Sequence, residues 1–118
     1  GSGAGIAAGQ TTANGTVAVG FNALGALTSG AGNVAVGCES QSAANNIGDF
    51  NTSVGYQALK AADPGSDGDG SNTAVGYLAG TAINTATQNT LIGSNSGDSL
   101  TSGIQLVQLL LLPPLLQH

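Results

Sequence analysis

Apolar and polar positions alternate in a short pattern that recurs along most of the chain. A β-branched residue, a small residue and a second β-branched residue stand in a row, and a glycine follows. Variants of this unit occupy residues 17–20, 34–37, 52–55, 73–76 and 90–93. Because side chains alternate between faces along a strand, the first and third residues share one face. Each unit therefore predicts a short β-strand that its glycine ends or bends.

The glycine of each unit serves as a marker of the repeat. Successive markers are separated by 17, 18, 21 and 17 residues, and the returns between units are rich in Gly, Ser and Asn. The markers are Gly20, Gly37, Gly55, Gly76 and Gly93. A composition of Gly, Asn, Thr and Val disfavours helix, and a near-constant period favours a coil over a hairpin meander. The chain is thus predicted to be all-β, a parallel β-solenoid or β-roll of about five or six short rungs.

Stacked rungs align equivalent residues into ladders. We expect the residues directly before the glycines to form an internal ladder, and Asn or Thr to form ladders at the turns. The expected core ladder comprises Val19, Val36, Val54, Val75 and Ile92. A core of Val, Ala and Thr buries little area per residue. Backbone hydrogen bonds, stacking of like units or association with other chains must then supply much of the stability.

The repeat resembles a known motif over about residues 1–103. The units resemble the NTAVGYxAL repeats of bacteriophage tail-fibre and related receptor-binding proteins, and they are similar to the SVAIGxxS head repeats of trimeric autotransporter adhesins. The matching positions are Thr16–Leu24, Asn33–Ser40, Asn51–Leu59, Asn72–Ala79 and Asn89–Ser96. The resemblance implies a parallel β-roll, usually trimeric, in a fibrous appendage at an extracellular or virion surface. A cell-surface receptor or glycan is an implied partner, but no residue here is assigned to its recognition.

Charged residues are scarce and predominantly acidic. They make up 6% of the chain, the net charge is −5, and Lys60 is the only basic residue apart from His118. Without a basic patch, binding to nucleic acid is not expected. Cys38 is the only cysteine, so no intrachain disulfide can form, and no acid–base or metal constellation of known spacing is present. The sequence therefore indicates a structural protein rather than an enzyme.

One loop carries side chains with the chemistry of a metal site. Asp63, Asp67 and Asp69 offer oxygen ligands suited to Ca²⁺. The loop lies in the 21-residue repeat, where extra residues must bulge outward. The competing interpretation is a solvated insertion, which requires no cofactor. Both are kept as hypotheses.

The last fifteen residues differ in character from the repeats. Residues 104–118 lack Gly, Asn, Ser, Thr and charge and form a second, Leu-rich segment. The apolar run is too short to span a membrane, and Pro113 and Pro114 interrupt it. The segment is predicted to cap the last rung, to join neighbouring protomers, or to be a non-native addition. Its expected assembly residues are Leu106, Leu109, Leu110, Leu111, Leu112, Leu115 and Leu116.

Three functional hypotheses follow. The first is a homotrimeric fibre shaft, and the second is an open-ended filament of solenoids joined end to end by the Leu-rich segment. The third is a glycan- or surface-binding module, suggested by the column of Thr52, Thr73 and Thr90. Cys38 falls in the column of Phe21, Tyr56 and Tyr77 and is expected to be a packed or half-exposed spacer, with a reactive thiol or an interchain disulfide as the alternative. We expect the two tyrosines to pack on each other, with contact with sugar as the alternative.

Overall fold

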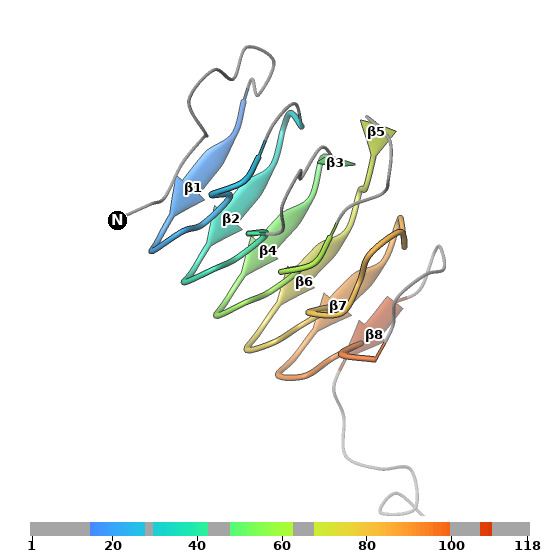
Figure 1. The fold of residues 1–118 in the computed structure, drawn as a ribbon. Coiled ribbons are helices and arrows are strands. Elements are labelled where there is room, and N and C mark those ends of the chain that lie inside the picture. The colour runs from blue at the N-terminus through green and yellow to red at the C-terminus, as the bar shows by residue number, and fades with distance from the viewer. Residues whose placement is uncertain (1–14, 28–29, 43–47, 63–67, 100–106, 110–118) are drawn as a thin grey trace, which may run out of the picture.

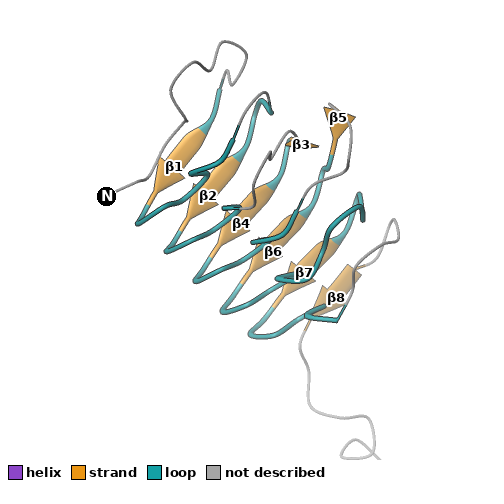
Figure 2. Ribbon diagram, viewed as in Figure 1, coloured by secondary structure: helices purple, strands orange, loops and turns teal. Residues whose placement is uncertain are grey.

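The computed structural model describes residues 15–27, 30–42, 48–62, 68–99 and 107–109, and the fold is a parallel β-solenoid (Figure 1). Every strand pairing is parallel. The described part of the chain contains no helix, and loops and turns join its short strands (Figure 2). Parallel neighbours require the chain to return to the same end each time, so the coil is confirmed and the meander is excluded.

Two sheets make up the coil. The larger sheet has the order β1-β2-β4-β6-β7-β8, and the smaller sheet pairs β3 with β5. The strands of the larger sheet are β1 (Val17–Val19), β2 (Val34–Val36), β4 (Thr52–Val54), β6 (Thr73–Val75), β7 (Thr90–Ile92) and β8 (Val107–Leu109). The smaller sheet consists of β3 (Gly48–Asp49) and β5 (Gly68–Asp69).

The register of the large sheet aligns the repeat units residue by residue. Val17 pairs with Val34, Val34 with Thr52, and the column continues to Val107. Hydrogen bonding goes on past the glycines, where the Glu39 amide donates to the Phe21 carbonyl at 2.8 Å. The Gln57 amide likewise donates to the Cys38 carbonyl at 2.9 Å. Each rung is therefore bonded to its neighbours on both sides of the bend.

The marker glycines form the bend itself. Each strand of the repeat ends directly before its glycine, and φ at these glycines lies between +123° and +136°. Successive rungs also approach closely here, because a Cβ added to Gly37 would lie 2.5 Å from the carbonyl oxygen of Gly55. Both the backbone angle and the close contact exclude a side chain.

The middle residue of each repeat strand faces the interior of the coil, and the valines on either side of it do not. Ala35, Ser53, Ala74 and Leu91, the middle residues of their strands, are fully buried. By contrast, Val19 is 53% exposed, Val17 48% and Val54 37%. The expected core ladder of Val19, Val36, Val54, Val75 and Ile92 is therefore corrected, because these residues face outward and none is buried. Period-two alternation separates two faces, and the middle residue of each strand takes the inward one.

A polar layer divides the core. One apolar cluster lies in the first rungs and a second lies in the later rungs. Between them, buried Gln41 donates from Nε2 to Ser53 Oγ at 2.7 Å and to the Val34 carbonyl at 2.9 Å, and Ser40 Oγ is hydrogen-bonded to Ser53 Oγ. The first cluster comprises Ala23, Leu24, Leu27 and Ala35, and the second comprises Leu59, Ala62, Ala74, Ala79, Ile83, Ala86 and Leu91.

A buried asparagine ladder runs along the starts of the strands, at the end opposite the glycine bend. The side-chain oxygens of Asn33, Asn51 and Asn72 each accept the backbone N–H of the next asparagine, at 2.8, 3.0 and 3.1 Å. Asn72 Nδ2 also donates to Asn51 Oδ1, and Asn89 Nδ2 donates to Asn72 Oδ1. An Asn ladder at the turn was predicted, and here it satisfies backbone donors that strand pairing leaves over.

Candidate functional site

The outward face of the large sheet is an apolar surface. We define the valine face as the first and third residues of the five repeat strands. They are Val17, Val19, Val34, Val36, Thr52, Val54, Thr73, Val75, Thr90 and Ile92. None of them is buried, and none carries a charge. A flat, uncharged array of β-branched side chains suits contact with another surface more than it suits water.

The outward direction of this face also gives a structural basis to the hypothesis of a glycan- or surface-binding module. Thr52, Thr73 and Thr90 were expected to face inward, together with the valines. The structure places this column on the outward face, half-exposed, with one threonine per rung. The column is therefore open to contact.

A second surface lies beyond the glycine bend, and we call it the turn face. Its first column consists of Phe21, Cys38, Tyr56, Tyr77 and Ser94, which follow the five marker glycines. The rings of Tyr56 and Tyr77 stack with centroids 5.6 Å apart and planes inclined by 15°. The tyrosines do pack on each other, as expected, but Phe21, Tyr56 and Tyr77 are all exposed.

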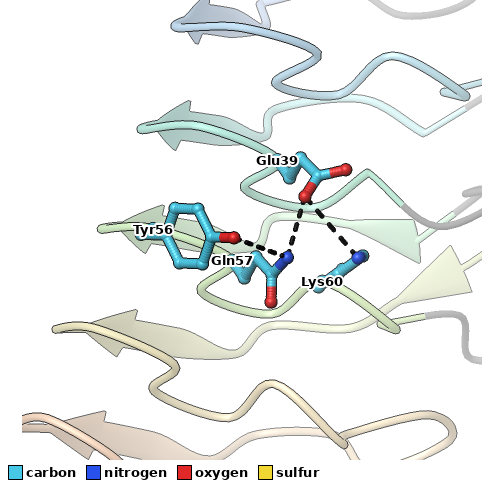
Figure 3. Close-up of polar contacts among 4 residues, drawn as sticks. All are labelled: Glu39, Tyr56, Gln57 and Lys60. Carbon is cyan, nitrogen blue, oxygen red and sulfur yellow. Dashed lines mark hydrogen bonds and ion pairs between the residues drawn. The ribbon is translucent and has the colours of Figure 1, made fainter.

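Polar side chains adjoin the ring of Tyr56 (Figure 3). Gln57 Nε2 donates to Glu39 Oε1 at 2.8 Å and to the Tyr56 hydroxyl at 3.2 Å. Lys60 Nζ lies 3.6 Å from the same Glu39 oxygen. Glu39 and Gln57 hold equivalent positions in successive rungs, and both adopt positive φ, at 58° and 55°. The two residues share a place two positions after Gly37 and Gly55, but that place alone does not predict which side chains meet.

The candidate calcium loop is described only in part. Asp63 and Asp67 lie outside the described residues, whereas the backbone of Asp69 pairs with that of Asp49 in the small sheet. No group of three or more His, Cys, Asp or Glu side chains that could hold a metal occurs in the described ranges. Calcium binding stays a prediction.

The Leu-rich segment contributes one strand to the sheet. Val107–Leu109 forms β8 and pairs with β7, so Leu109 is opposite Ile92. The other expected assembly leucines, and the rest of residues 104–118, lie outside the described ranges. The sheet thus continues across the boundary drawn at residue 103, which agrees with a role of the segment in covering the last repeat. Within the described residues, no helix has the length and apolar character needed to cross a membrane.

Cys38 is a free, half-buried thiol in the aromatic column. Its position agrees with the predicted role of spacer, and an interchain disulfide or a reactive thiol stays untested.

Comparisons with known protein families, with curated proteins and with solved structures found no match to this chain. The two surfaces therefore have to be interpreted from their own chemistry.

Proposed function

We propose that the chain is a non-catalytic structural module of a fibre, such as the shaft of a phage tail fibre or an adhesin-like appendage at an extracellular or virion surface. The observation that carries the proposal is the valine face. Alternation along each strand turns its middle residue inward, so the coil presents the flanking β-branched side chains outward and in register.

Association of identical chains through the valine face gives these side chains a partner. Full burial of a valine contributes about 1.5 kcal/mol or more, and the face offers six valines and an isoleucine per chain. The face carries no charge, so like copies meet without repulsion or desolvation of ions. We propose a homotrimer, in which three valine faces enclose a shared apolar axis.

Sedimentation velocity tests the proposal. The wild-type chain is expected to sediment as one species of about 34 kDa, three times 11.3 kDa, and to persist on dilution. Val54→Lys places a charge in the middle of the valine face, at a side chain already 37% exposed, so the variant should fold as an 11.3 kDa monomer. Ser94→Lys adds the same charge on the turn face and should stay trimeric. A wild-type monomer, or a trimeric Val54→Lys variant, would contradict the proposal.

An end-to-end filament is the second candidate, and the ends of the sheet favour it. Within the described residues, β1 and β8 each have one pairing neighbour, and all strands run parallel. Parallel edges at opposite ends of a coil are complementary to each other and do not close into a ring. A filament would give a distribution that broadens with concentration and collapses to monomers when residues 104–118 are removed. The trimer would keep its mass on dilution.

A further inference from the structure

The valine face consists of two columns that differ in chemistry. The last residue of each repeat strand is Val or Ile at every rung, whereas the first residue is Val in β1 and β2 and Thr in β4, β6 and β7. We call the first residues of the strands the first column and the last residues the second column. The first column comprises Val17, Val34, Thr52, Thr73 and Thr90, and the second column comprises Val19, Val36, Val54, Val75 and Ile92.

Strand pairing keeps the two columns separate along the coil. Val34 pairs with Thr52 and Val36 with Val54, and the same register holds from β1 to β7. The strands stack side by side (Figure 1), about 4.8 Å apart, and residues two apart in a strand are separated by roughly 7 Å. The first column therefore runs along the starts of the strands, and the second column runs parallel to it, next to the glycine bend.

The second column is also the more exposed of the two. In β4, the Val54 side chain is exposed, at 37%, whereas Thr52 is half-buried. In β1, Val19 is 53% exposed and Val17 48%. A more exposed apolar side chain has more area to remove from water when another chain covers it. The second column therefore gains more from a partner than the first.

Three-fold symmetry makes the choice between the columns an exclusive one. The axis of a trimer relates equivalent residues of the three chains, so one column lies at the axis and the other lies to one side of it. A hydroxyl at the axis is removed from water, and it weakens the assembly unless it finds a hydrogen-bond partner. The first column would place threonines at the axis at three levels, whereas the second would place only Val and Ile there.

We infer that the second column forms the centre of the contact between chains and that the threonines of the first column lie at its rim. The inference rests on the trimer proposed above and identifies the residues that determine it. An apolar centre with a polar, solvent-accessible rim is the common anatomy of protein interfaces. At the rim, the hydroxyls of Thr52, Thr73 and Thr90 stay in reach of water, so the threonine column remains open to contact in the assembled fibre.

Two charged variants of one strand test the assignment. Thr73 and Val75 are the first and last residues of β6, and both are half-buried. Val75→Asp puts a carboxylate at the centre of the contact, so this variant is expected to sediment as an 11.3 kDa monomer. Thr73→Asp puts the same charge at the rim and is expected to keep a mass of about 34 kDa, three times 11.3 kDa. Far-UV circular dichroism of both variants reports on the fold independently of assembly.

Two conservative variants of β2 give a finer comparison. Val34→Thr extends the threonine column by one rung, whereas Val36→Thr places a hydroxyl in the second column. The readout is the chain concentration at which half of the trimer has dissociated, measured by sedimentation over a dilution series. This concentration should rise by about tenfold or more for Val36→Thr and stay within about threefold of wild type for Val34→Thr.

The outcomes separate this inference from the trimer on which it rests. Dissociation of both aspartate variants, or of Thr73→Asp alone, would overturn the assignment of the columns and leave the trimer standing. Equal shifts in Val34→Thr and Val36→Thr would overturn the assignment as well. A monomeric wild-type chain, or two aspartate variants that both remain trimeric, would instead contradict a trimer formed through the valine face.

Discussion

Leu91 fills the interior space that Gly97 leaves empty. A Cβ added to Gly97 would lie 2.8 Å from Leu91 Cδ1, and Leu91 itself is fully buried. Other rungs use the reverse arrangement, with Ala18 or Ser53 in the strand and Leu24 or Leu59 on the turn segment. In these three rungs, one wall of the coil supplies a large side chain at this pair of positions and the other wall supplies a small residue.

This size complementarity predicts strong coupling between positions 91 and 97. Leu91→Ala should lower the free energy of unfolding by about 2–5 kcal/mol through the cavity it leaves. Gly97→Leu alone should also destabilise, because its side chain would collide with Leu91. The double variant restores the arrangement of the Leu24 and Leu59 rungs, where leucine adopts φ of +52°. Urea unfolding of the four proteins should show the double variant to be more stable than the sum predicts, and additive losses would contradict the argument.

The asparagine ladder predicts a position-specific loss. Asn72→Ala removes the acceptor of the Asn89 backbone N–H, at 3.1 Å, and the donor to the Ala86 carbonyl, at 2.9 Å. A buried polar group deprived of its partner costs about 1–3 kcal/mol, and Asn51 Oδ1 and Asn89 Nδ2 each lose a hydrogen bond as well. We expect Asn72→Ala to lose about 2–4 kcal/mol by urea unfolding.

Asn84→Ala is the control for the ladder, because Asn84 is exposed in a bend of the same rung. A substitution at such a surface site should change the free energy of unfolding by less than about 0.5 kcal/mol. Equal losses in the two variants would mean that the ladder does not contribute beyond an ordinary asparagine.

The marker glycines predict a contrast between two alanine substitutions. Gly37 has φ of +130°, and an added Cβ would lie 2.5 Å from the Gly55 carbonyl oxygen. Gly15 has φ of +68° with no atom within 4 Å of such a Cβ. Gly37→Ala should therefore cost about 3 kcal/mol or more through strain and overpacking, whereas Gly15→Ala should cost about 1–2 kcal/mol through strain alone. Thermal unfolding of both variants measures the difference, and similar midpoints would refute the close approach of rungs at the bend.

The repeat pattern predicts the fold better than it predicts the surfaces. Columns defined by Gly20 to Gly93 give the strands and their register, because parallel stacking aligns equivalent residues. Alternation alone does not say which face of a strand is inside. The usual preference for burying valine over alanine predicted that the valines face inward, and that prediction was wrong. Thr52, Thr73 and Thr90 lie on the same face as the valines and indicated instead that this face is outward. An inward threonine would need a hydrogen-bond partner inside the coil.

The side-chain contacts of the turn face could not be predicted from the sequence, for a different reason. The meeting of Glu39 with Gln57 and Lys60 depends on residues of two rungs turning through positive φ, at 58° and 55° for the first two. Such angles are uncommon for residues other than glycine and asparagine. Local propensity therefore does not place these side chains, whereas the hydrogen-bonded neighbouring rungs do.

The polar layer of the core yields the last prediction. In the first rung, Ala23, Leu24 and Ala18 hold the positions equivalent to Ser40, Gln41 and Ser53. The three polar side chains are hydrogen-bonded to one another or to the Val34 carbonyl. Ser53→Ala alone takes a partner from both Ser40 and Gln41 and should cost about 1–3 kcal/mol.

Replacing the whole layer, by Ser40→Ala, Gln41→Leu and Ser53→Ala together, removes the buried polar groups and joins the two apolar clusters. The triple variant should therefore be at least as stable as wild type in urea, in the way that replacing a complete buried polar set by apolar groups of similar shape is nearly neutral or stabilising. If the triple variant is less stable than Ser53→Ala, the polar layer does more than satisfy its own members, and its hydrogen bonds are required to hold the second and third rungs in register.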